Sequence, residues 1–128
     1  MEYLLDTHTF LWFINGDAQL SKKAREAIVD SDAIKYISIA SFWEIAIKVN
    51  LGKLSLDMPY IDLRQQVTDN GFEILPITFS HTAELISLYL HHRDPFDRVI
   101  IAQAVSERLI LISKDGNFEK YSQLTLLW

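Results

Sequence analysis

Short apolar runs alternate with amphipathic segments of helix length along this chain, and this alternation constrains its fold more than any other feature. Short apolar runs predict strands at residues 3–5, 34–39, 73–77, 109–112 and 124–127. Helical periodicity is predicted at residues 7–15, 21–30, 41–50, 59–69, 80–91 and 95–107. Because a helix-length crossover separates most successive strands, parallel pairing is favoured. The pattern predicts an α/β fold with a mostly parallel central sheet and helices on both faces.

Length and composition indicate one domain and exclude several classes of protein. The 128 residues contain no linker, repeat or low-complexity stretch, so we expect a single domain over residues 1–128. The chain has no cysteine, which excludes disulfide scaffolds, zinc–thiolate sites and thiol nucleophiles. No apolar run reaches the roughly 18 residues of a membrane span, and the start of the chain is acidic where a signal peptide is basic. We therefore expect a cytoplasmic protein with no membrane partner.

Carboxylates fall where a parallel sheet places its ligands. In open α/β sheets, ligands bind beyond the carboxyl ends of the strands. Four separate segments each supply one acid at that edge: Asp6, Glu44, Asp97 and Asp115. Four like charges in one crevice repel and lose hydration, so a cation is needed to balance them. Because no thiolate is available, we expect a hard, oxygen-seeking ion, Mg²⁺ or Mn²⁺.

Each acid also has a purely structural interpretation. Asp6 and Asp94 are suited to cap the helices that begin after them, and Asp115 starts an Asp-Gly-Asn turn. Ser41 and Glu44 have the spacing of a capping box, in which Glu44 accepts from the Ser41 N–H. The functional interpretation therefore depends on the acids taken together.

An acidic metal site of this kind suits hydrolysis of a phosphodiester bond. A divalent ion polarises a phosphoryl oxygen, lowers the pKa of a bound water and neutralises charge in the transition state. The formal net charge of −5 gives no bulk attraction for nucleic acid, although bound divalent ions would offset much of it. Arg93, Arg98 and Lys114 lie next to the acids in the sequence and are candidates for phosphate contacts, with a surface role or carboxylate pairing equally open.

Histidine and aromatic residues near these acids are given structural roles. His8 follows Asp6 too closely to converge on the same ion, and residues 91–92 fall at the end of the predicted helix 80–91, where solvated histidines are common. Aromatic side chains can stack on RNA bases, but helical spacing favours a core or subunit contact for four of them: Trp12, Phe13, Phe42 and Trp43.

Four motifs occur in a recognisable order and spacing: Leu4-Leu5-Asp6-Thr7-His8-Thr9-Phe10-Leu11-Trp12, Ser38-Ile39-Ala40-Ser41-Phe42-Trp43-Glu44-Ile45, Arg93-Asp94-Pro95-Phe96-Asp97-Arg98-Val99-Ile100-Ile101-Ala102-Gln103-Ala104 and Ile112-Ser113-Lys114-Asp115. With them the sequence resembles the PIN-domain ribonucleases over essentially its whole length. It is most similar to the small VapC-type toxins of type II toxin–antitoxin systems.

The resemblance implies a role for each matching residue. Asp6, Glu44 and Asp97 match the three core acidic positions that bind the catalytic divalent ion, and Asp115 matches a fourth, more variable one. Asp94 would support these ligands or cap its helix, and small hydroxyl positions are matched by Thr7 and Ser113. The implied activity is a metal-dependent endoribonuclease that acts on RNA, forms a homodimer and is neutralised by an antitoxin whose peptide covers the active-site groove.

Two other functions share part of this pattern. A receiver-type phospho-acceptor module has the same length, α/β order and acidic Mg²⁺ pocket, with Lys114 as its lysine. It requires adjacent acids after the first strand and an acceptor Asp after a middle strand, where this chain has the single Asp6 and Ser38. A non-catalytic PIN-like binding module would be recognised by the loss of an acidic position, and none is lost.

Overall fold

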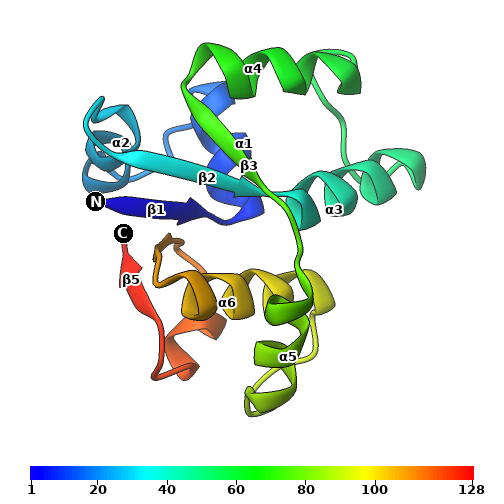
Figure 1. The fold of residues 1–128 in the computed structure, drawn as a ribbon. Coiled ribbons are helices and arrows are strands. Elements are labelled where there is room, and N and C mark those ends of the chain that lie inside the picture. The colour runs from blue at the N-terminus through cyan, green and yellow to red at the C-terminus, as the bar shows by residue number, and fades with distance from the viewer.

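The computed structural model describes residues 1–128 and contains one five-stranded sheet (Figure 1). Its strands are β1 (Glu2–Leu5), β2 (Ile34–Ser38), β3 (Phe72–Leu75), β4 (Ile110–Ile112) and β5 (Thr125–Leu127). They lie in the order β3-β2-β1-β4-β5, and every neighbouring pair is parallel. The predicted α/β class with a parallel sheet is confirmed.

The helices occupy the connections between the strands. They are α1 (Thr7–Asn15), α2 (Lys22–Val29), α3 (Ile39–Asn50), α4 (Leu63–Asp69), α5 (Phe79–Ser87) and α6 (Pro95–Glu107), with 3₁₀ turns η1 (Tyr60–Asp62) and η2 (Gly116–Lys120). The chain first builds the sheet from β1 to β3 and then returns through α5 and α6 to add β4 and β5 on the other side of β1. The strand order therefore reverses between β1 and β4. No helix is both long and apolar enough to cross a membrane.

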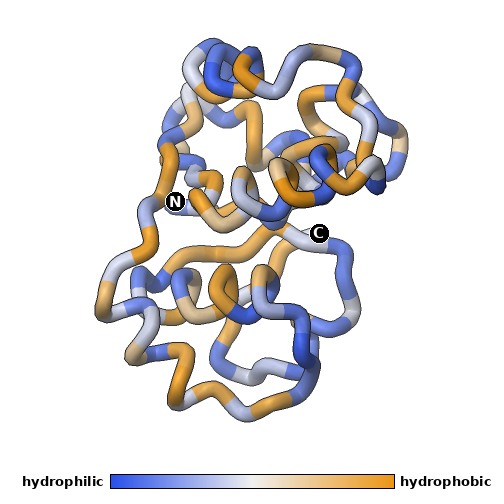
Figure 2. The backbone as a smooth tube through the Cα atoms, turned by 90° about the vertical axis from the view of Figure 1, so that its right-hand side faces the viewer, coloured by the Kyte–Doolittle hydropathy of each residue, from blue (hydrophilic) through white to orange (hydrophobic).

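Alternate side chains of the central strands enter two separate cores, one on each face of the sheet. Tyr3 and Leu5 of β1 pack with side chains of α1, α2, α3 and α4. Leu4, between them, packs with α6 and with residues around η2 on the opposite face. Figure 2 shows the apolar stretches running through the middle of the molecule between these layers. Because a strand points successive side chains to opposite faces, continuously apolar strands require helices on both sides, as predicted.

The boundary error that most affects the site concerns α5, which ends at Ser87 although helical periodicity continues to residue 91. Leu88 is extended and buried, so its side chain enters the second core instead of continuing the helix. Arg98 donates to the carbonyl oxygens of Leu88 (3.4 Å) and Tyr89 (3.1 Å). Since this tertiary contact satisfies the carbonyls, residues 88–94 form an irregular loop that leads to α6.

Candidate active site

Asp6 lies at the end of β1, beside the point where the strand order reverses, which is the usual place for a ligand in an open α/β sheet. Its Oδ1 accepts from the Thr9 N–H (2.8 Å), so Asp6 caps α1 as predicted. Its Oδ2 accepts from the Ser113 hydroxyl at 2.5 Å. Burial raises the pKa of Asp6, and the hydrogen bonds from Ser113 and Thr9 oppose that rise. Asp6 therefore serves as a helix cap and is also a buried acid.

Glu44 reaches the same region from α3. Its carboxylate is buried, with a relative exposure of 4%. The Thr7 hydroxyl donates to Glu44 Oε1 (2.8 Å) and lies 2.9 Å from the Ser41 hydroxyl. Lys48, one helical turn later, places its Nζ 2.7 Å from Oε2. Both carboxylate oxygens of Glu44 are thus held by side chains of α1 and α3.

The interpretation of Ser41 and Glu44 as a capping box is wrong, because Ser41 does not cap α3. Because α3 begins at Ile39, directly after β2, Ser38 takes the N-cap position and its hydroxyl accepts from the Ala40 N–H (3.0 Å). Ser41 is then inside the helix, where it is fully buried and meets Thr7 of α1. The two hydroxyls position Glu44 instead of closing the start of the helix.

Asp97 lies in the first turn of α6, whose N-cap is Asp94. Asp94 Oδ1 accepts from the N–H groups of Phe96 (2.9 Å) and Asp97 (3.0 Å), so the predicted cap is present. The Asp97 side chain is 21% exposed, and its Oδ2 lies 3.3 Å from Nε2 of His92. The backbone of α6 therefore fixes the position from which Asp97 enters the site.

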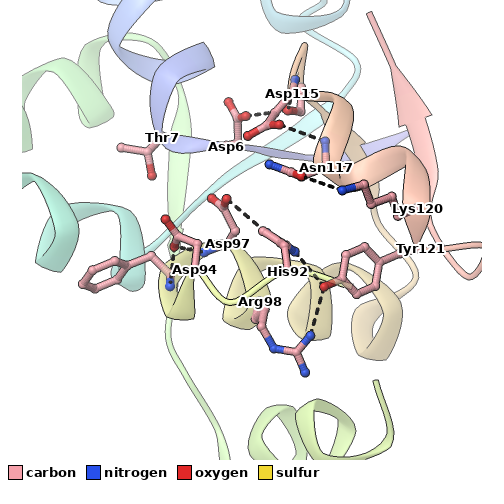
Figure 3. A network of polar contacts seen from close by, with 12 residues as sticks. Asp6, Thr7, His92, Asp94, Asp97, Arg98, Asp115, Asn117, Lys120 and Tyr121 are labelled. Atoms are coloured by element: carbon pink, nitrogen blue, oxygen red, sulfur yellow. Dashed lines mark hydrogen bonds and ion pairs between the residues drawn. The ribbon is translucent and has the colours of Figure 1, made fainter. Parts of the chain in front are cut away.

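The pKa of Asp97 shows that the acids share one region. Burial, followed by repulsion from neighbouring carboxylates, raises this pKa to about 7; the neighbours, in order of effect, are Asp94, Asp115, Glu44 and Asp6. Figure 3 shows the aspartates gathered between the end of β1, the start of α6 and the segment after β4. Asp115 is exposed and caps η2, with Oδ1 accepting from the Asn117 N–H (2.9 Å). We call Asp6, Glu44, Asp94, Asp97 and Asp115 the acidic cluster.

His92 lies beside the acidic cluster, contrary to its predicted place at a helix end. Its Nδ1 lies 2.7 Å from the Tyr121 hydroxyl, which also accepts from Arg98 (2.9 Å). Arg98 can only donate, so the Tyr121 oxygen accepts from Arg98 and its hydroxyl proton is free to point to Nδ1 of His92. Nε2 of His92 then carries the ring proton and donates it to Asp97. Burial lowers the pKa of His92. The early end of α5, which nothing in the local sequence indicates, is what turns His92 inward.

The three basic candidates for phosphate contacts lie in different surroundings. Arg98 is engaged with Tyr121 and the loop carbonyls. Arg93 lines a separate pocket of about 430 Å³ between α5 and α6. Lys114 lines a pocket of about 330 Å³ together with Asp6 and Asp115. Only Lys114 thus shares a pocket with members of the acidic cluster.

The four aromatic residues assigned to a core or interface also separate. Phe42 is buried and Phe13 packs partly buried against the first core, as expected. Trp43 is 58% exposed and meets Phe96 edge-on with ring centroids 5.2 Å apart. Trp12 packs partly against the core and also lines the pocket beside Asp6. Trp43 therefore lies outside the core of this chain, where a subunit contact stays a prediction, and Trp12 lines a pocket in addition to packing against the core.

The chemistry of the acidic cluster fits a hard divalent cation. All of its donors are carboxylate oxygens, which hard divalent cations prefer. Burial raises the pKa of Asp6, whereas burial and repulsion from neighbouring carboxylates raise the pKa of Asp97, and a bound cation would offset both effects. Lys48, on Glu44, is the one ammonium paired with the cluster. In this conformation no three Asp, Glu or His side chains are arranged to hold a metal ion, because Asp6 and Glu44 direct their oxygens to protein donors.

Comparison with known proteins agrees with this architecture. A family model described as the PIN domain matches residues 3–124. Ribonuclease VapC22 of Mycobacterium tuberculosis (strain ATCC 25618 / H37Rv) is 30% identical over 119 residues, covering 92% of this chain and 90% of that protein.

Solved structures of toxin–antitoxin complexes share the fold. VapBC2 from Rickettsia felis, bound to a DNA fragment from its promoter, superposes with a TM-score of 0.75 at 17% identity, covering 99% of this chain and 98% of the other. DNA-bound VapBC from Salmonella typhimurium gives a TM-score of 0.76 at 16% identity, with 99% and 97% covered. The match of the family model over residues 3–124 and the 30% identity to VapC22 show that the chain belongs to the PIN domain family.

Proposed function

We propose that this protein is a divalent-metal-dependent endoribonuclease and the toxin of a type II toxin–antitoxin system. The observation that carries this proposal is the acidic cluster, in which buried Asp6 and Glu44 face Asp97 with a pKa raised to about 7. A concentration of acids at the strand-order reversal of a parallel sheet suits binding of a cation and a phosphate. The similarity to a protein named ribonuclease VapC22 supports the same activity.

Asp6, Glu44, Asp97 and Asp115 would hold Mg²⁺, with Mn²⁺ as the alternative ion. The bound ion supplies a Lewis acid for the scissile phosphate and for the attacking water. The remaining residues position these acids. Ser113 orients Asp6, Thr7 orients Glu44, and Asp94 fixes the first turn of α6 from which Asp97 projects.

His92 and Lys48 each contact one acid of the acidic cluster. His92 holds Asp97 through Nε2 and is itself held by Tyr121, so these two contacts restrain the Asp97 carboxylate. Lys48 neutralises part of the charge on Glu44. In both cases one side chain limits the rotation of an acid that would otherwise move away from its like-charged neighbours.

The partners follow from the family likeness and from exposed surfaces. Several similar solved structures are VapBC complexes, which supports a cognate antitoxin for this chain.

We also propose a cytoplasmic homodimer. Its interface would use the apolar surface of α5 and the following loop, where the exposed fractions are 87% for Ile86, 74% for Tyr89 and 56% for Leu90. An Ile86→Lys variant is expected to elute as a monomer where the unchanged protein elutes as a dimer.

Neither alternative function is favoured by the structure. The chain belongs to the PIN domain family, and Asp6 stands alone at the end of β1 where a receiver needs a pair of acids. A non-catalytic binding module needs no cluster of destabilising like charges, yet all four predicted acidic positions are present.

Cleavage of an unpaired oligoribonucleotide that carries a fluorophore and a quencher tests the activity. We expect cleavage with Mg²⁺ or Mn²⁺, none with excess EDTA, and a loss of at least about a hundredfold in Asp6→Asn and Asp97→Asn. Asp57→Asn, at an exposed position outside the cluster, is the matched control and should cleave normally. Full activity in both cluster variants, or in EDTA, would overturn the proposal.

Growth and co-purification test the toxin assignment separately. Expression of the protein should arrest bacterial growth, and Asp97→Asn should remove the arrest. A small protein encoded in an adjacent reading frame should co-purify with the Asp97→Asn variant and restore growth when expressed with the unchanged protein. If no adjacent product binds, the toxin role fails while the nuclease activity stands.

A further inference from the structure

A pocket of about 330 Å³ opens beside the acidic cluster, between α1 and the segment that follows β4. Its lining residues are Asp6, His8, Trp12, Gln19, Lys114 and Asp115. This volume lies within the range of about 300–1,000 Å³ that is typical of sites for small organic groups. Because Asp6 and Asp115 belong to both the pocket and the cluster, a group held in the pocket lies next to the acids.

Two aromatic rings form one wall of this pocket. His8 and Trp12 are one helical turn apart and therefore lie on the same face of α1. Their ring centroids are 5.9 Å apart, with an angle of 36° between the planes. Trp128 meets the Trp12 indole at 5.8 Å and 63°, and it packs against the first core. The contacts with Trp128 and the first core thus hold the indole in place, and the same indole lines the pocket beside Asp6.

Lys114 supplies an ammonium group that forms no ion pair with the surrounding acids. Its side chain is exposed, and Nζ lies 6.0 Å from the centroid of the Trp12 indole. No carboxylate lies within ion-pair distance of this ammonium, although Asp115 is the next residue. An exposed and unpaired ammonium can leave the indole face to meet a phosphate.

We propose that this pocket is a base-binding subsite for unpaired RNA, an inference that rests on the proposed ribonuclease function. A nucleotide next to the scissile phosphate places its base against Trp12 and His8 and its phosphate beside Lys114. Gln19, from the turn between α1 and α2, lies where its amide can hydrogen-bond to the edge of that base.

The net charge of the protein favours a subsite that binds RNA without bulk electrostatic attraction. With a net charge of −5, the chain has no general attraction for a polyanion, so affinity must come from local contacts. Stacking is available only to a base that has left a duplex, because paired bases are covered by their neighbours. The subsite therefore selects single-stranded segments and aligns them with the acids.

Binding can be measured apart from cleavage in an Asp97→Asn background, using the fluorescence anisotropy of a labelled unpaired hexaribonucleotide. His8→Ala and Trp12→Leu should each weaken binding about 5- to 150-fold, the range of one base-stacking contact. Lys114→Gln should lower the slope of log affinity against log salt by about 0.7, the value of one phosphate contact with a single strand. Ile61→Ala in η1 and Lys23→Gln on α2, both exposed, are the matched controls and should change neither quantity.

The position of the base is tested with RNAs that carry one abasic nucleotide on either side of the cleavage point. At one position, removal of the base should lower kcat/KM about tenfold in the otherwise unchanged protein and have little effect in Trp12→Leu. Equal losses in both proteins at every position would overturn the subsite. If Trp12→Leu proves unfolded by circular dichroism, His8→Ala, at an exposed position, replaces it in the same comparison.

The outcomes separate the subsite from the function on which it rests. If the unchanged protein cleaves no RNA, the proposed function fails. If it cleaves RNA and the pocket variants bind and cleave equally well, only the subsite fails. Weaker binding of the antitoxin with unchanged binding of RNA would assign the pocket to the antitoxin and overturn the RNA proposal.

Discussion

The hydroxyl of Ser113 donates to Oδ2 of Asp6 at 2.5 Å and joins residues that are 107 positions apart in the chain. Asp6 ends β1 and Ser113 directly follows β4, so the bond crosses the point where the strand order reverses. The Asp6 N–H also donates to the carbonyl oxygen of Ile112 (3.2 Å). The position of this acid therefore depends on the correct pairing of β1 with β4.

Replacing Ser113 with Ala should reduce activity more than stability. The variant leaves Asp6 Oδ2 without its donor, which costs about 1 kcal/mol of unfolding free energy. Loss of a partner that orients a metal ligand lowers metal affinity or activity by about 10- to 100-fold. Titration of cleavage rate against Mg²⁺ measures this effect. Ser106→Ala, at an exposed position on α6, is the control, and equal rates in the two variants would contradict the orienting role.

Asp97→Asn should inactivate the enzyme and stabilise the metal-free protein above neutral pH. Because the pKa of Asp97 is raised from 3.8 to about 7 by folding, its contribution to stability is complete below pH 3.8 and is lost as the pH rises through 7. A shift of this size corresponds to about 4 kcal/mol as an upper limit, and partial exposure to solvent reduces the expected gain to about 1–2 kcal/mol.

Melting temperatures in EDTA at pH 4 and pH 8 measure this difference. The Asn variant should melt close to the unchanged protein at pH 4 and several degrees higher at pH 8. Asp57→Asn should show no such pH-dependent difference. A variant that is less stable at pH 8 would show that Asp97 gains more from its neighbours than it loses to repulsion.

Divalent metal should stabilise the unchanged protein by binding to the folded state. At an ion concentration of 100 times Kd, linkage gives about 2.7 kcal/mol. Asp6→Asn and Asp97→Asn should lose most of this stabilisation. Their folds should persist, because Asn caps α1 about as well as Asp at position 6, and because loss of the Asp97 charge relieves repulsion from its neighbours. Scanning calorimetry with and without Mg²⁺ measures the effect. Equal stabilisation in all three proteins would place the ion outside the acidic cluster.

Lys48→Gln should shift the stability of the metal-free protein and the affinity for metal in opposite directions. The ammonium lies 2.7 Å from Glu44 Oε2, and the Glu44 side chain is only 5% exposed. Its removal leaves a buried charge unpaired, which costs about 1–3 kcal/mol in the absence of metal. The same change makes the site more negative and should tighten Mn²⁺ binding, as measured by calorimetric titration. Lys53→Gln, in the exposed turn after α3, is the control.

The sheet and its acids could be predicted because both follow from local patterns. Apolar strands separated by helix-length crossovers favour parallel pairing, and the carboxyl ends of parallel strands share one edge of the sheet. Asp6 and Asp94 are also expected as helix caps and Asp115 as the first residue of a turn, and each accepts from backbone N–H in the structure. The assignment of these residues to a metal site stays a prediction, whereas the capping roles of Asp6 and Asp94 are confirmed.

What could not be predicted depends on contacts between distant segments. The end of α5 is determined by the burial of Leu88 and by hydrogen bonds from Arg98, neither of which leaves a mark on the helical periodicity. Because α5 ends early, His92 lies in the loop after it and contacts Asp97 instead of lying at the end of a helix. Lys48, in contrast, had a local signal, since it lies four residues after Glu44 on the same helix and such pairs meet on one face. Trp12 shows a further limit, because spacing cannot distinguish a core side chain from one that also lines a pocket.

The capping role of the aspartates has a consequence for how such an enzyme can diverge. Asp6, Asp94 and Asp115 are each tied to the backbone N–H groups of the segment that follows them. Their locations are therefore set by where each following segment begins, and for Asp6 also by the pairing of β1 with β4. Substitutions can accumulate over the surrounding surface, and RNA preference can drift with them, while the charges stay in place.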